Sequence, residues 1–150
     1  MICARNPKPM NQKPLILLVE DDEMDAFLIR RTLVNAGVCN PYRVLDNGEA
    51  AISYLKGEGP YANREQHPLP GLVLLDLKMP GMDGFEVLKW IRSRADLSAL
   101  RIVVLTGSCE VHEADLAHQM GANFFLDKSR DFESVHLLGA TLKDQRVWMS

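Results

Sequence analysis

Acidic, hydroxyl and basic side chains stand directly after separate apolar runs of this chain. In sequence order they are Glu20, Asp21 and Asp22, then Asp76, then Thr106 and Ser108, and finally Lys128. A short, uninterrupted apolar run is typical of a strand buried on both faces of a sheet. Because ligands bind at the carboxyl ends of the strands in an open α/β sheet, we expect these side chains to converge at one edge.

The residue types suit phosphoryl chemistry assisted by a divalent cation. Carboxylates held together repel one another, and a hard cation relieves that repulsion. Mg²⁺ needs only one or two protein carboxylates, with water and phosphate oxygens completing its shell. Asp76 can then attack phosphorus as a nucleophile, while Lys128 and the cation neutralise the phosphoryl oxygens. The Thr106 hydroxyl can donate a hydrogen bond to one of those oxygens.

Each residue alone has a simpler interpretation. The acidic triplet could be favourable charge at a helix N-terminus, and Asp76 could be a turn residue. Thr106 alone is more often a capping or packing hydroxyl, and Lys128 alone is usually a solvated lysine. The joint position of these residues after four predicted strands favours the functional interpretation.

Composition limits the class of protein. The chain has 150 residues and a net charge of −3, which fits one domain and gives no sign of a nucleic-acid surface. Its apolar runs are far shorter than the roughly 20 residues that span a bilayer, and the N-terminus lacks the apolar core of a secretory signal. Cys3, Cys39 and Cys109 have no metal-ligand spacing. We therefore predict a cytoplasmic protein with free thiols and no membrane segment.

Hydrophobic periodicity predicts strands alternating with helices. Strands are predicted at 15–19, 42–46, 72–75, 101–105 and 124–126. Helices are predicted at 23–36, 85–94 and 112–120, with a short helix capped by Asn47 that runs to 55 and a last helix capped by Asp131 or Ser129 that runs to about 147. This alternation predicts a doubly wound five-stranded parallel sheet, flavodoxin-like in its order 2-1-3-4-5, with helices on both faces. Residues 1–14 are predicted to be a flexible tail.

Four segments carry a resemblance to a known family. They are Leu17–Asp22, Asp76–Gly84, Val104–Gly107 and Gly121–Lys128. Through them the chain resembles the receiver domain of two-component response regulators, which we place at residues 15–150. The resemblance implies phosphotransfer from a histidine kinase or phosphotransfer protein to an aspartate, with Mg²⁺ as cofactor. It also implies that the protein assists its own phosphorylation and dephosphorylation but is not an enzyme acting on external substrates.

The resemblance assigns a role to each matching position. Asp76 corresponds to the phosphorylated aspartate, Glu20 and Asp21 to the metal-binding acids, Lys78 to the residue whose backbone carbonyl is a metal ligand, Thr106 and Lys128 to the phosphoryl-contacting pair, and Phe125 to an aromatic switch residue. Two positions depart from the family pattern. Ser129 stands where proline commonly follows the lysine, so we expect either a trans bond or stored strain there. Phe125 lacks the hydroxyl of the commoner tyrosine, so a switch through Thr106 and Phe125 would depend on packing.

The narrower resemblance is to single-domain regulators, including those paired with bacterial phytochrome kinases. Because few residues follow Lys128, we expect no output domain and an output through protein contact. The face made by the fourth helix, fifth strand and last helix is a candidate homodimer interface. Trp148 is expected either to pack on the body of the domain or, as the favoured alternative, to lie in that interface.

Three other functions fit parts of the pattern. A Mg²⁺-dependent phosphohydrolase also forms an aspartyl phosphate, but such enzymes resemble a pattern with a second Asp where this chain has Lys78. A receiver-like interaction module that is never phosphorylated usually lacks part of the acid, hydroxyl and lysine set. A flavodoxin-like cofactor binder would need a phosphate-binding loop after the first strand, where Glu20, Asp21 and Asp22 would repel phosphate in the absence of a metal.

Overall fold

The structure, a computed structural model, describes residues 13–107, 111–144 and 148. Within these residues one parallel sheet has the order β2-β1-β3-β4-β5. Its strands are β1 (Ile16–Val19), β2 (Tyr42–Leu45), β3 (Leu72–Asp76), β4 (Arg101–Thr106) and β5 (Phe124–Asp127). The predicted doubly wound sheet and its strand order are therefore confirmed.

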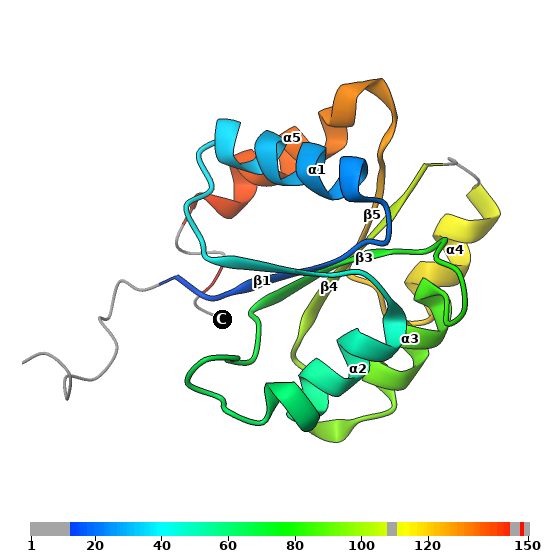
Figure 1. Cartoon of the computed structure of the whole chain (residues 1–150). Helices are drawn as coiled ribbons and strands as arrows, with labels where there is room; N and C mark the ends of the chain where they lie inside the picture. The colour runs from blue at the N-terminus through cyan, green and yellow to red at the C-terminus, as the bar shows by residue number, and fades with distance from the viewer. Residues whose placement is uncertain (1–12, 108–110, 145–147, 149–150) are drawn as a thin grey trace, which may run out of the picture.

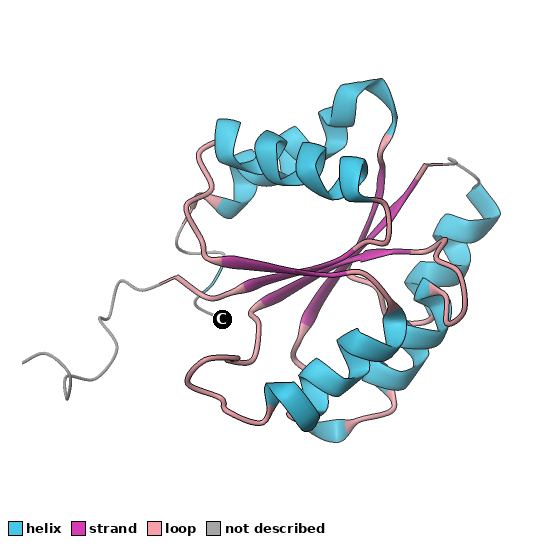
Figure 2. Cartoon of the chain, viewed as in Figure 1, coloured by secondary structure: helices cyan, strands magenta, loops and turns pink. Residues whose placement is uncertain are grey.

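Helices cover both faces of the sheet (Figures 1 and 2). On one face lie α1 (Glu23–Asn35) and α5 (Ser129–Leu142), and on the other lie α2 (Gly48–Lys56), α3 (Gly84–Arg92) and α4 (Val111–Gln119). Short 3-10 turns, η2 (Gly59–Tyr61) and η3 (Ala95–Leu97), interrupt two of the connections. Each face of the sheet has its own buried apolar cluster. Among the described residues, no helix has the length and apolar character needed to cross a membrane.

The central strands bring the first two acidic positions together. Every residue of β1 and β3 is buried, which requires apolar side chains on both faces of these strands. Val19 at the end of β1 is in register with Leu75, the residue before Asp76. Glu20 and Asp76 therefore leave adjacent strands at the same edge of the sheet.

Helix α3 begins very close to the backbone of Asp76. The N–H of Gly84 donates a hydrogen bond of 2.9 Å to the carbonyl of Leu77. A Cβ atom at position 84 would overlap the carbonyl oxygen of Asp76 and lie 2.7 Å from Cα of Leu77. Glycine is needed here because of this close approach, and not because of an unusual φ angle.

The start of α5 differs from the prediction. The helix begins at Ser129 with Lys128 at the N-cap position and without a side-chain capping bond, so neither Ser129 nor Asp131 is the cap. Lys128 is instead attached to the sheet, because its N–H donates a hydrogen bond of 2.8 Å to the carbonyl of Thr106. The described chain contains no cis peptide bond, so Lys128–Ser129 has the trans form, one of the two expected outcomes.

The end of α5 also differs, since the helix stops at Leu142 and not near residue 147. The indole N–H of Trp148 donates a hydrogen bond of 2.8 Å to the carbonyl of Leu142. Trp148 packs against the apolar cluster under α1 and α5, which supports the alternative of packing on the body of the domain. Residues 147 and 149, together with the predicted tail before Lys13, lie outside the described residues.

Candidate metal and phosphoryl site

Three carboxylates meet at the carboxyl edge of the sheet. Glu20, Asp21 and Asp76 each offer an oxygen within 4.8 Å of the others. Glu20 and Asp76 are only 1% and 3% exposed, whereas Asp21 is accessible to solvent. The donor set consists of oxygen atoms, and one of its members faces solvent, so it fits a Mg²⁺ ion that keeps several water ligands.

The third acid of the triplet has a different task. Asp22 is the N-cap of α1, and its Oδ1 accepts a hydrogen bond of 3.0 Å from the N–H of Asp25. Its own N–H donates to Oε2 of Glu20 at 3.3 Å. Asp22 thus caps the N-terminus of the helix, as Ser, Asp and Asn commonly do. Of the three consecutive acids, Glu20 and Asp21 remain for the cluster with Asp76.

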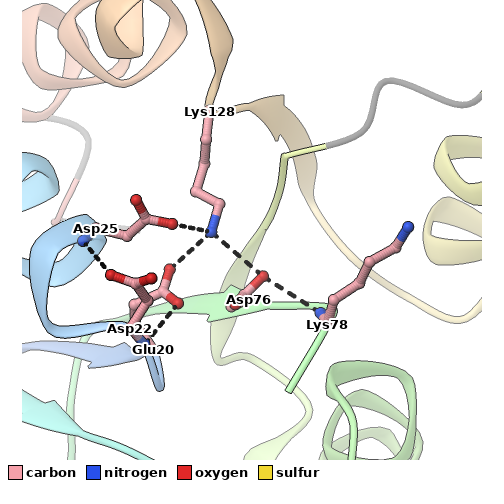
Figure 3. A network of polar contacts seen from close by, with 6 residues as sticks. All are labelled: Glu20, Asp22, Asp25, Asp76, Lys78 and Lys128. Atoms are coloured by element: carbon pink, nitrogen blue, oxygen red, sulfur yellow. Dashed lines mark hydrogen bonds and ion pairs between the residues drawn. The ribbon is translucent and has the colours of Figure 1, made fainter. Parts of the chain in front are cut away.

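Lys128 follows the carboxyl end of β5, and its side chain extends into this cluster (Figure 3). Its Nζ donates hydrogen bonds of 2.9 Å to Oε1 of Glu20 and to Oδ2 of Asp25, and lies 3.6 Å from Oδ1 of Asp76. The side chain of Lys128 is only 10% exposed. The lysine, the predicted acids and the predicted nucleophile are therefore together, although they come from distant parts of the sequence.

Asp25 is the residue of this network that sequence reasoning missed. It lies in the first turn of α1, where an acid has an ordinary explanation as favourable charge at a helix N-terminus. The sequence signal that could have found it is weak: an acid three residues after an N-cap, on the helix that follows the acidic strand end. Its side-chain bond to Lys128 distinguishes it from neighbouring Glu23, which is exposed.

The pocket contains more acid than base, and this changes the proton affinities. Burial, assisted by contact with Asp76, raises the pKa of Glu20 to about 8. Burial also raises the pKa of Asp76, against the opposing effects of Glu20 and Lys128. Burial alone would lower the pKa of Lys128. Hydrogen bonds to Asp25 and Glu20 raise this pKa by more than burial lowers it, so the net pKa is raised. One ammonium is thus shared by several carboxylates, and the pocket favours additional positive charge.

The two predicted switch residues lie on one face of the sheet. Thr106 is fully buried at the end of β4. Phe125 is in register with Val104, which lies two residues before Thr106 and therefore on the same side of the strand. Phe125 packs against the apolar cluster beneath α2, α3 and α4.

Lys78 contacts the site through its backbone N–H, which donates a hydrogen bond of 3.3 Å to Oδ1 of Asp76. Its side-chain Nζ points away and lies 3.8 Å from Oε2 of Glu113 on α4. The role of its carbonyl as a metal ligand stays a prediction. Ser108 and Cys109 lie outside the described residues, and Cys39 is an exposed free thiol.

Acids after the first and third strands of a 2-1-3-4-5 sheet, with a lysine after the fifth, define the receiver class of signalling domains. The family model described as the response regulator receiver domain matches residues 16–138, so the chain belongs to this family. The receiver family is part of two-component signalling and does not consist of metabolic enzymes.

The similar proteins include response regulators, one of which is described as a phytochrome response regulator. Response regulator Rcp1 from Synechocystis sp. is 35% identical over 125 residues, which cover 83% of each chain. The solved Mn²⁺-bound form of Rcp1 is similar with a TM-score of 0.74 and 32% identity, covering 92% of this chain and 96% of that one. The phosphorylated cyanobacterial phytochrome response regulator RcpA gives a TM-score of 0.76 and 32% identity, covering 91% of this chain and 94% of that one.

Proposed function

We propose that this protein is a phosphoacceptor switch in which Asp76 receives a phosphoryl group from a histidine kinase or phosphotransfer protein. The observation that carries the proposal is the position of the Lys128 ammonium, 3.6 Å from Oδ1 of Asp76 within the acid cluster. Relatives described as Mn²⁺-bound and as phosphorylated support the same assignment. We further propose that the domain acts in the cytoplasm, where its kinase would present the phosphoryl group.

The proposed reaction is an in-line displacement at phosphorus. A carboxylate oxygen of Asp76 forms the new P–O bond as the P–N bond of the donor phosphohistidine breaks. Lys128 helps to keep Asp76 ionised and neutralises charge on the phosphoryl oxygens, and Thr106 donates a hydrogen bond to one of them. When bound by Glu20, Asp21, Asp76 and the Lys78 carbonyl, Mg²⁺ supplies further charge neutralisation. Attack of water on the acyl phosphate resets the switch, without turnover of an external substrate.

The proposed output depends on packing next to Thr106. A phosphoryl group on Asp76 draws the Thr106 hydroxyl toward it, and the Phe125 ring moves into the space that this side chain leaves. The face made by α4, β5 and α5 then changes its affinity for a partner, for which a second copy of this chain is a candidate. Light scattering with and without a phosphoryl analogue measures whether this face forms a homodimer. The mass of a monomer both with and without the analogue would contradict the homodimer.

Labelling with a small phosphodonor tests the central assignment. With acetyl phosphate and Mg²⁺, we expect the intact mass to rise by one phosphoryl group in the wild-type protein and in Asp83→Asn, but not in Asp76→Asn. Asp83 is a suitable control because it caps α3 in the following loop, and asparagine caps helices equally well. Normal labelling of Asp76→Asn would refute the assignment. Absence of wild-type labelling would favour an interaction module that is not phosphorylated, and rapid hydrolysis of phosphate esters would favour a phosphohydrolase.

A further inference from the structure

We propose that Asp25 is a positioning residue that competes with the phosphoryl group on Asp76 for the ammonium of Lys128. The inference rests on the proposed function of Asp76 as the phosphoacceptor. It assigns Asp25 a specific effect on the phosphorylated state, which goes beyond helix stabilisation. Asp25 does not contact the reacting atoms, so it acts only through Lys128.

The hydrogen bonds of Lys128 show which carboxylates its ammonium binds most closely. An ammonium has three N–H donors, and two of them are directed at Glu20 and Asp25 at 2.9 Å. The distance of 3.6 Å to Oδ1 of Asp76 is an ion pair but too long for a hydrogen bond. In this structure the lysine is therefore bonded to Asp25 in preference to the phosphoacceptor (Figure 3).

The start of helix α1 is held firmly by its N-cap and by buried residues. The N–H of Asp25 is held by the N-cap side chain of Asp22 at 3.0 Å. The next residue, Ala26, is buried, and Ile29 is fully buried against the sheet. The backbone of Asp25 therefore has a fixed position, and its short side chain limits how far the carboxylate can follow Lys128. A phosphoryl group on Asp76 that attracts the ammonium must weaken the bond between Lys128 and Asp25.

Removal of the Asp25 charge should strengthen binding at Asp76. In Asp25→Asn an amide oxygen can still accept from Lys128, but a neutral acceptor binds an ammonium less strongly than a carboxylate does. Lys128 is then released more easily to a phosphoryl group. We expect the affinity for a phosphoryl analogue to rise about fivefold, which is typical of replacing a charge-assisted hydrogen bond by a neutral one.

Beryllium trifluoride with Mg²⁺ is a stable analogue of the phosphoryl group, and calorimetry measures its dissociation constant. The matched control is Glu23→Gln, which removes the same charge from an exposed position in the same turn of α1. We expect Asp25→Asn to bind about fivefold more tightly and Glu23→Gln to stay within about twofold of wild type. In a Lys128→Gln background, the Asp25 substitution should have no more effect than the Glu23 substitution.

A second measurement does not depend on analogue binding. In the metal-free protein, the ¹⁵Nζ resonance of Lys128 should shift in Asp25→Asn and remain in place in Glu23→Gln. Thermal unfolding checks that each variant is folded, and Asp25→Ser serves as a second variant if the amide disturbs the helix. Serine is well tolerated near helix N-termini and removes the same charge.

The outcomes separate the two proposals. If wild-type protein does not bind beryllium trifluoride, the proposed function of Asp76 fails. If wild type binds it but Asp25→Asn behaves like Glu23→Gln, the function stands and the positioning role of Asp25 is wrong. An equal gain from Asp25→Asn in the Lys128→Gln background would show that the charge of Asp25 acts directly on the bound anion, and that outcome would also overturn the inference.

Discussion

Replacement of Asp76 by asparagine should stabilise the metal-free protein while it abolishes phosphorylation. The side chain is 3% exposed and lies beside Glu20, which is 1% exposed. Burial raises the pKa of both carboxyls, so folding disfavours their ionised forms in comparison with the unfolded chain. Asparagine has nearly the same shape and carries no charge. It removes both the desolvation cost of Asp76 and its repulsion of Glu20.

The size of the effect is a difference between two opposing contributions. The lost ion pair between Lys128 and Asp76 was long, at 3.6 Å, and Lys128 keeps its bonds of 2.9 Å to Glu20 and Asp25. The hydrogen bond of 3.3 Å from the Lys78 N–H can be kept, because the side-chain oxygen of asparagine also accepts. Removal of the buried charge should therefore dominate, with a gain of about 1–2 kcal/mol. For a domain of this size, such a gain raises the melting temperature by roughly 3–6 °C.

Calorimetric unfolding in EDTA and in millimolar Mg²⁺ measures this difference. Mg²⁺ should stabilise the wild-type protein more than Asp76→Asn, because the variant has lost a predicted metal ligand. The advantage of the variant should therefore shrink as Mg²⁺ is added. Asp83→Asn, an exposed change of the same kind, should stay within about 0.5 kcal/mol of wild type. A variant that melts at or below the wild-type temperature in EDTA would refute this account of the pocket.

Further predictions concern proton binding and two packing contacts. Because the pKa of Glu20 rises from 4.5 to about 8 on folding, the folded state binds its proton more tightly; the free energy of unfolding without metal should therefore fall as pH rises from about 5 to 8. Urea melts in EDTA should show this slope in the wild type and less of it in Glu20→Gln, and a flat wild-type profile would contradict it. Gly84→Ala should lower the free energy of unfolding by about 2 kcal/mol or more, because its Cβ would lie 2.7 Å from Cα of Leu77. In Gly107→Ala the new Cβ meets nothing within 4 Å, so the free energy of unfolding should fall by less than about 1 kcal/mol. Trp148→Phe removes the indole hydrogen bond and should lower the free energy of unfolding by about 1 kcal/mol. Equal thermal stability of the variant and the wild type would show that this bond contributes nothing.

The strand order could be predicted because the signals that determine it are local. The buried strands β1 and β3 are continuous apolar runs, and right-handed crossovers leave few ways to arrange them. Asn47 could likewise be recognised as a helix cap, and its side chain accepts from the N–H of Ala50 at 2.7 Å. The neighbourhood of Glu20 and Asp76 then followed from the rule that parallel strands share a carboxyl edge.

The ends of α5 could not be predicted because long-range contacts set them. A polar residue before an apolar helix normally caps it, so Ser129 and Asp131 were reasonable candidates. The hydrogen bond from the Lys128 N–H to the Thr106 carbonyl instead determines where the chain enters the helix. At the other end, the indole of Trp148 satisfies the Leu142 carbonyl, a contact that no spacing rule predicts.

Asp25 shows where residue-by-residue transfer of roles from a family stops. That transfer predicts the positions that touch the metal or the phosphoryl group, but a competitor for Lys128 need touch neither. Asp25 lies 103 residues from Lys128 in sequence, and its bond of 2.9 Å exists only because α1 and β5 meet at the same edge of the sheet. Since the N-cap Asp22 holds Asp25 in place, the geometry of α1 is coupled to the lysine that would hold the phosphoryl group. The phosphorylated state should therefore respond to changes that move Asp25 or its cap Asp22, even though neither residue takes part in the proposed chemistry.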